Sequence, residues 1–162
     1  MGMIGNYLSI DAKKLESVLD GEVNILDLEE EADPEKELFD IDKSWQAIQY
    51  LLCQDIDEGE SPMGYVVPMM IENGIECEMD FGAFYLTSEQ VQETRDYLCA
   101  LSDDEIKQMY DFQSMVEDEI YPLVEGEDED EFYEYMFYHL SELKEFYKRA
   151  AGQGHAVIFY IM

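Results

Sequence analysis

Basic residues are scarce in this sequence. Nine Lys and Arg stand against 40 Asp and Glu, which leaves a formal net charge of −31 in a chain of 162 residues. Nucleic-acid binders and proteins that bind anionic membranes need basic side chains to displace counterions. The composition therefore excludes both classes and favours attraction to cationic partners or metal ions. The alternative is an acidic surface that only keeps the protein soluble.

Cysteine is rare as well. Cys53, Cys77 and Cys99 are widely spaced and include no C-x-x-C pair, which fits reduced thiols better than a disulfide framework. The chain does not open with a basic region followed by an apolar run, so no signal peptide is visible. The apolar run 156–162 is far too short to cross a bilayer. We therefore expect a soluble, cytoplasmic protein.

The residues and motifs of common active sites are few. No Gly-rich loop with a following Lys or Arg offers a phosphate site, and no Cys/His cluster has the spacing of a zinc site. Only His139 and His155 supply imidazole. We expect His139 on the apolar side of a helix, His155 exposed in a Gly-rich turn, and the three thiols buried and inert. The sequence thus predicts no catalytic residue, no cofactor and no metal site.

Apolar residues, by contrast, are plentiful, at 47% of the chain, which is typical of a globular protein. Residues 3–10 alternate between apolar and polar positions as a strand does, and 156–162 are apolar on both faces. We expect the second segment inside a sheet, beside the first. The prediction is a single α+β domain over 1–162, with a small mixed or antiparallel sheet that uses both chain termini and about five helices packed on it.

Helix boundaries are marked by capping motifs. Asp11 is expected to cap a short helix, which Gly21 is well placed to end. Residues 87–90 (TSEQ) and 102–105 (SDDE) each form a capping box, in which two side chains satisfy backbone amides at a helix start. The second box predicts one helix that continues to Tyr121, which precedes a proline. A long helix is predicted over 132–150. Residues 22–37 are ambiguous, with 29–31 read as an exposed loop.

Two further strands are predicted in the middle of the chain. Residues 65–71 favour an edge or irregular strand, because Pro68 cannot donate a ladder hydrogen bond. Residues 75–81 (IECEMDF) alternate apolar and acidic side chains, as a half-buried strand does. Its acidic face fits either a cation or basic partner, or an edge strand that charge protects from aggregation.

An acidic loop between Gln54 and Gly64 resembles the start of an EF-hand calcium loop. It contains Asp55, Asp57 and Gly59, but the glycine comes one position too early and no glutamate follows at position twelve. We read it as a solvated loop.

The stretch 38–52 contains the only tryptophan and is predicted to be the central packing helix. Ile41, Trp45 and Ile48 fall on one helical stripe, and Asp40 or Asp42 is expected as the N-cap.

The same stretch gives the candidate site, because two carboxylates, an indole, an amide and a phenol fall close together. These are Asp40, Asp42, Trp45, Gln49 and Tyr50. They fit the lining of a small-molecule or partner site. The structural alternative is that Asp42 caps the helix, Trp45 packs and Gln49 is solvated.

A second aromatic group is expected on the long helix. Tyr133, Tyr135, Phe137 and Tyr138 lie outside its strict apolar stripe. They favour either a partner or dimer surface or burial under the acidic loops.

Several segments resemble the YfbM-like family of bacterial proteins. They are 1–7 (MGMIGNY), 40–43 (DIDK) with Trp45, 50–52, 86–87 with Gln90, 120–122, 146–147 and 156–158. The resemblance implies an α+β single domain and carries no activity and no catalytic residues. Family members often have His four residues after the tryptophan and Thr-Gly after the helix. Gln49 and Cys53-Gln54 stand at those places here, so no imidazole chemistry is expected there.

Two hypotheses follow for the function. The first is a non-catalytic binding protein of the bacterial cytoplasm whose acidic surface engages a basic protein partner, including an inhibitor or immunity-type role. The second is a small-molecule or divalent-cation binding protein, including a hydrolytic enzyme, that uses Asp40, Asp42, Trp45 and Gln49. The sequence does not indicate an oligomeric state.

Overall fold

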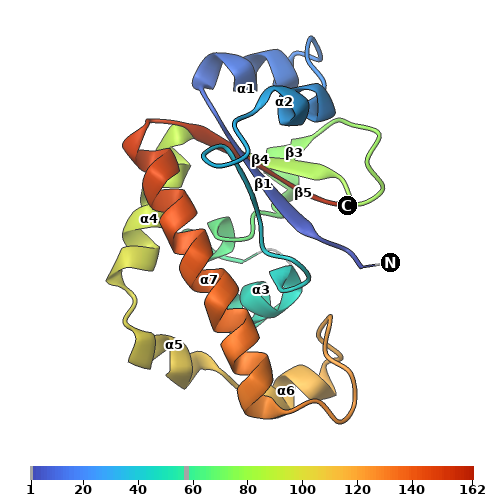
Figure 1. Ribbon diagram of the computed structural model, residues 1–162, viewed down its shortest axis with the longest axis vertical. Coiled ribbons are helices and arrows are strands. Elements are labelled where there is room, and N and C mark those ends of the chain that lie inside the picture. The colour runs from blue at the N-terminus through green and yellow to red at the C-terminus, as the bar shows by residue number, and fades with distance from the viewer. Residues whose placement is uncertain (1, 57–58) are drawn as a thin grey trace.

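A five-stranded antiparallel sheet joins the two ends of the described chain (Figure 1). The computed structural model describes residues 2–56 and 59–162. The strands lie in the order β2-β1-β5-β4-β3. Their bounds are β1 Gly5–Ile10, β2 Leu38–Asp40, β3 Gly74–Ile75, β4 Ala83–Leu86 and β5 Ala156–Ile161. β5 is central, pairs with β1, and is buried at all six residues, which confirms the position predicted for this apolar segment.

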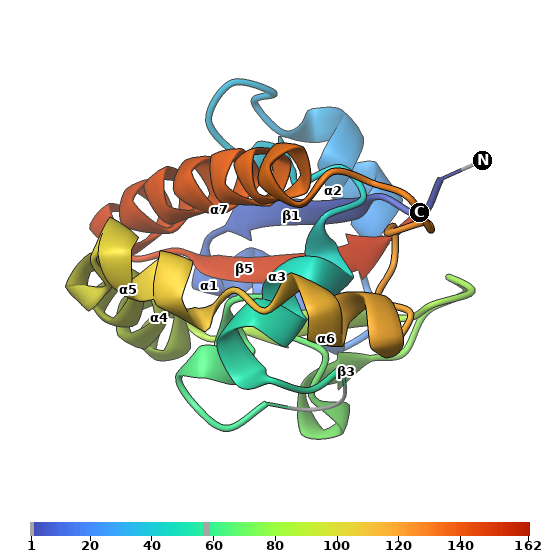
Figure 2. The same ribbon diagram turned by 90° about the horizontal axis from the view of Figure 1, so that it is seen from below.

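Helices cover both faces of the sheet, so the fold class is α+β (Figure 2). The described residues form seven α-helices, against about five predicted. They are α1 Ala12–Leu19, α2 Ile25–Glu31, α3 Trp45–Cys53, α4 Ser88–Ala100, α5 Asp103–Met109, α6 Phe112–Glu117 and α7 Glu129–Gly152, with 3-10 turns η1 Met63–Tyr65 and η2 Ile71–Asn73. No helix in the described part of the chain is both long and apolar enough to cross a membrane.

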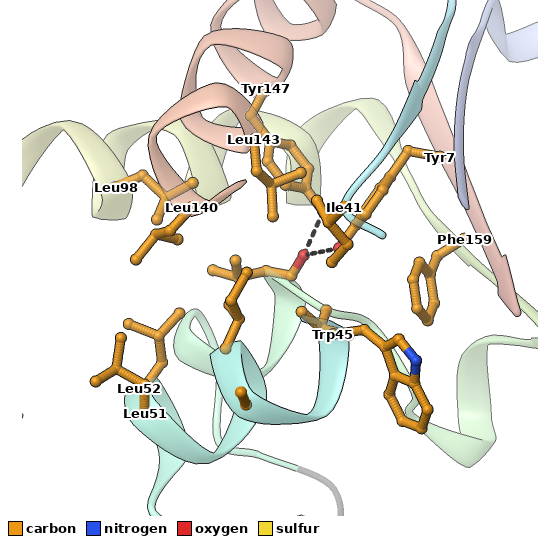
Figure 3. Close-up of a cluster of buried hydrophobic side chains, with 14 of the residues drawn as sticks. Tyr7, Ile41, Trp45, Leu51, Leu52, Leu98, Leu140, Leu143, Tyr147 and Phe159 are labelled. Atoms are coloured by element: carbon orange, nitrogen blue, oxygen red, sulfur yellow. Dashed lines mark hydrogen bonds between the residues drawn. The ribbon is translucent and has the colours of Figure 1, made fainter. Parts of the chain in front are cut away.

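Two apolar cores form because successive strand residues point to opposite faces. Leu8 and Ile158 pack with residues of α1 and α2. Tyr7 and Phe159 pack on the other face, with α3, α4 and α7. The second core is larger and contains Trp45 (Figure 3), which is 7% exposed. Its Nε1 donates to the Met3 carbonyl oxygen at 2.9 Å.

Capping signals located several helices correctly. Asp11 accepts from the Lys14 amide at 2.8 Å and starts α1. Thr87 and Gln90 form the predicted capping box of α4. Asp128, which was not predicted as a cap, starts α7 at Glu129, three residues before the predicted start of the long helix.

The prediction of a single helix from 103 to 121 is wrong. The chain is extended at Tyr110, and Asp111 begins a second helix by accepting from the Ser114 amide at 3.1 Å. Tyr110 packs its ring 4.9 Å from that of Tyr133 in α7, a contact that sequence spacing alone does not show. The break at Tyr110 gives one helix more than predicted. α2 is the other, because it includes residues 29–31, which were expected to form a loop.

The strands predicted over 65–71 and 75–81 are largely absent. Residues 65–71 include the end of η1 and the start of η2, and the second segment has strand structure only at its first residue, Ile75. The Val66 carbonyl accepts from Tyr7 Oη at 2.7 Å and from Tyr147 Oη at 2.9 Å (Figure 3). Side chains thus take the place of a neighbouring strand at this carbonyl.

The stretch 38–52 is a strand, a turn and a helix, and not one helix as predicted. α3 begins at Trp45, and its N-cap is Ser44, not Asp40 or Asp42. Asp42 lies in the turn with φ 49°, a left-handed conformation that Asp tolerates better than most residues. The acidic loop that resembles the start of an EF-hand includes Asp57, and Asp57 lies outside the described residues.

Candidate functional site

The five candidate residues occupy different surroundings. Trp45, Gln49 and Tyr50 are buried on α3, at 7%, 1% and 8% exposure. The structural alternative is therefore correct for Trp45, which packs in the core. It is wrong for Gln49, which was expected to be solvated and is buried. Asp40 lines a hollow of about 210 Å³ beside β1 and β2, while Asp42 lines a separate hollow of about 590 Å³. The five do not share one cavity.

The Asp42 hollow lies between the turn before α3 and the start of α7. Its lining is acidic and aromatic. The residues are Asp42, Lys43, Pro122, Gly126, Glu127, Asp128, Glu131, Phe132 and Tyr135. The lining thus has four carboxylates and a single lysine, and its two parts, 42–43 and 122–135, lie at least 79 positions apart in the sequence.

Tyr135 holds the Asp42 carboxylate in place. Tyr135 Oη donates to Asp42 Oδ2 at 2.7 Å and accepts from the Lys43 amide at 3.1 Å. Burial, and then the hydrogen bond to Asp42, raise the pKa of Tyr135, so the phenol stays protonated and keeps donating. Asp42 Oδ1 accepts no hydrogen bond from the described residues.

His139 lies behind Tyr135, with its ring edge-on at a centroid distance of 4.9 Å. Burial lowers the pKa of His139, and the nearby carboxylates of Asp42, Asp40 and Glu142 oppose that shift. The imidazole is therefore neutral at physiological pH. It does not cancel the negative charge of Asp42.

The start of α7 adds negative charge to the hollow. Asp128 Oδ1 accepts from the backbone amides of Asp130 and Glu131, each at 3.0 Å. A helix N-terminus carries about half a positive charge. Asp128 together with the first-turn acids Glu129, Asp130 and Glu131 outweighs that charge, so this end of α7 is negatively charged.

The aromatic group on α7 is mostly packed against neighbouring side chains. The rings of Tyr133 and Phe137 stack 5.7 Å apart, and Lys107 Nζ lies 3.9 Å from the centroid of Tyr133. Tyr138 is 61% exposed. Lys107 belongs to α5 and Tyr133 to α7, so this aromatic surface accommodates a cation from a neighbouring helix.

Ser9, which the sequence did not indicate as a site residue, meets His155 at the sheet. Ser9 Oγ and His155 Nδ1 are 2.9 Å apart, so His155 is half-buried and not exposed as predicted. Ser9 is 1% exposed, which keeps its hydroxyl away from substrates. The pair links β1 to the residue that precedes β5.

The cysteines are free thiols in the structure. Cys77 and Cys99 are exposed, so the prediction of buried thiols is wrong for both. Cys53 is half-buried, and burial, followed by the charge of Asp55, raises its pKa to about 11. The described residues contain no group of three or more His, Cys, Asp or Glu that is able to hold a metal ion.

Comparisons with known proteins bear on family and fold. Residues 1–160 match the family described as a domain of unknown function, DUF1877. The crystal structure of YfbM from Escherichia coli, a protein of unknown function, is similar with a TM-score of 0.75 at 22% sequence identity, over 98% of this chain and 99% of that one. At this identity the likeness shows the fold. No curated protein matches.

Proposed function

This chain belongs to the DUF1877 family of domains of unknown function, the family it resembles in sequence. Because the function of the family is unknown, we propose a function from the structure of the site: the chain binds a basic protein partner. The Asp42 hollow receives a Lys or Arg side chain of that partner. One observation carries the proposal: a carboxylate positioned by Tyr135 at the wall of an acidic, aromatic hollow. An inhibitor or immunity-type role is one form that such recognition takes.

The contacts of Asp42 favour a cationic group as the ligand. One carboxylate oxygen is held by the phenol of Tyr135, while the other accepts no hydrogen bond from the described residues. A guanidinium or ammonium group donates to such an oxygen in a charge-assisted bond. Because Tyr135 fixes the carboxylate beforehand, less conformational entropy is lost on binding.

The rest of the hollow suits the same ligand. Phe132 and Tyr135 contribute aromatic surface, against which the methylene groups and the charge of a Lys or Arg side chain pack. Glu127 and Glu131 supply further negative charge. Lys43 is the single base in the lining, so the balance stays negative.

Charge over the whole molecule favours a protein partner. The formal charge of −31 repels nucleic acids and anionic membranes. Two ion pairs, Arg95–Asp96 and Lys148–Glu145, are formed by the described residues, so most acids have no cationic side chain beside them. Such a surface attracts a basic protein at long range, and the hollow adds a specific contact.

NMR titration with short arginine-rich peptides tests the proposal. The Lys43 amide is a direct reporter because it donates to Tyr135 Oη. We expect its resonance and those of Gly126 and Asp128 to shift together at low peptide concentration. The double variant D42N/E131Q removes two charges from the hollow and is expected to weaken binding by about tenfold.

A matched variant separates the hollow from general acidity. E93Q/D104N removes the same charge from exposed positions on α4 and α5, and we expect it to bind like the wild type. Y135F keeps the charge but frees Asp42, and a smaller loss of affinity is expected. Equal weakening by D42N/E131Q and E93Q/D104N, or shifts scattered over all acidic surfaces, would contradict the proposal.

A further inference from the structure

A second surface, separate from the Asp42 hollow, lies at the open edge of the sheet. We propose that it binds an extended segment of a basic protein, which pairs as a strand beside β3 and residues 76–79. In this segment Lys or Arg alternates with apolar residues. The inference goes beyond the function proposed above, because it concerns a different site and a different mode of recognition.

A groove marks this surface. It has a volume of about 480 Å³ and lies between residues 18–26, at the end of α1 and the start of α2, and residues 75–79. Its apolar lining includes Val18 and Ile25, which are buried, and Leu26, which is 43% exposed. Figure 1 shows this region, where β3 lies near α2, at the end of the molecule away from α6. We call it the edge groove.

The backbone beside the groove has no strand partner on its outer side. β3 is the last strand in the sheet order. Within the described part of the chain, the amides of Glu76, Cys77 and Glu78 donate no backbone hydrogen bond. The chain bends at Glu78, and the Met79 carbonyl accepts from the Gly82 amide at 3.1 Å. Residues 76–78 therefore have to extend on binding, and their free amides then serve as a template for another strand.

The sequence next to the groove has the pattern of a strand. Ile75 and Met79 pack with the core under α1 and α2, whereas Glu76, Cys77 and Glu78 are exposed. This apolar and acidic alternation predicted a strand, yet only Gly74 and Ile75 form one in the isolated chain. A strand added along 75–79 would complete the predicted structure.

Charge complementarity identifies the occupant. Opposite charges on directly facing strand positions attract, and like charges repel. Glu76 and Glu78 therefore select Lys or Arg at the facing positions, while the apolar positions of the same segment enter the groove near Leu26. A second copy of this chain is disfavoured, because two molecules of charge −31 would bring the same glutamates together.

The test measures binding of labelled peptides in which Lys or Arg alternates with Val or Ile. Fluorescence anisotropy gives the affinity, and amide hydrogen exchange of the full chain locates the site. We expect slowed exchange at residues 76–79 on binding. The charge reversal E76K/E78K is expected to weaken binding by at least about tenfold, and L26Q by a smaller factor.

Matched controls separate strand pairing from attraction to any acid. E93K/E117K makes the same charge change at exposed positions of α4 and α6, and it should leave the affinity within about twofold of the wild type. Peptides of equal composition with the basic residues in one block should bind more weakly, because they cannot place apolar residues in the groove.

Three results would overturn the inference. The first is that none of the alternating peptides binds. The second is protection near Lys43 and Asp128 in place of 76–79, which would assign the peptides to the Asp42 hollow. The third is a dimer of this chain, seen by sedimentation, that E76K/E78K abolishes. D42N/E131Q should not change binding at the edge groove, so the two proposals fail independently.

Discussion

The shared acceptor of two buried tyrosines gives a direct test of how the larger core is held. Tyr7 Oη and Tyr147 Oη both donate to the carbonyl oxygen of Val66, at 2.7 Å and 2.9 Å, and Tyr147 also lies 3.1 Å from the Tyr65 carbonyl. Both rings are 0% exposed. Burial raises the pKa of each phenol, so both remain donors. The perturbation is Tyr7→Phe and Tyr147→Phe, singly and together.

The expected losses are not additive. Tyr7→Phe removes one hydrogen bond, and Tyr147→Phe removes the bond that its hydroxyl shares between the Val66 and Tyr65 carbonyls. Each single change leaves the Val66 carbonyl bonded to the other tyrosine, at a cost of about 1 kcal/mol. The double change leaves that buried carbonyl without a donor, which adds about 1–3 kcal/mol of desolvation cost. We therefore expect the double variant to lose about 3–5 kcal/mol, of which about 1–3 kcal/mol is the interaction between the two sites.

Urea unfolding followed by the fluorescence of Trp45 measures these losses, because it is the only tryptophan and is buried. The slope of free energy against urea should stay constant across the variants. Tyr138→Phe removes a hydroxyl from a ring that is 61% exposed, and it should change stability by less than about 0.5 kcal/mol. Losses that add within about 0.5 kcal/mol would refute the reasoning.

Three further predictions concern other parts of the fold. Thr87→Ala should cost about 1 kcal/mol in urea unfolding, because it removes the capping hydroxyl of α4; an unchanged midpoint would contradict this. Cys77 and Cys99 should react rapidly with a thiol reagent at neutral pH and Cys53 slowly, since a pKa of about 11 keeps it a thiol; mass spectrometry of the modified peptides checks the order. The lowered pKa of His139 means that the unfolded chain binds the proton first as pH falls through its ordinary value of about 6.5, so stability falls. His139→Gln should lessen that fall, and an identical pH profile for both proteins would count against it.

Local signals in the sequence were sufficient for much of the fold. Six buried residues in β5 follow from an apolar segment without polar alternation. Asp11 and Thr87 mark helix starts because capping depends on residues three positions apart. These features need no knowledge of the rest of the chain.

Long-range contacts account for what sequence reasoning missed. The segment around Val66 is not a strand, and its carbonyl is bonded by tyrosines 59 and 81 positions away. The Asp42 hollow depends on Tyr135, at a separation of 93 positions. Asp42 was identified as a candidate, but no local pattern places Tyr135 beside it. The other four candidates were grouped by sequence proximity, but Asp40 ends strand β2 and the remaining three lie on helix α3, where neighbouring residues point to different sides.

The central position of β5 has a consequence for how the protein is made. β1 and β4 are not neighbours in the sheet, and each pairs with β5, which spans Ala156–Ile161. During synthesis, residues 1–155 emerge from the ribosome before the segment that joins them is available. The nascent chain must therefore keep two incomplete apolar surfaces apart until those last strand residues arrive, and its many acidic side chains discourage neighbouring nascent chains from associating in the meantime.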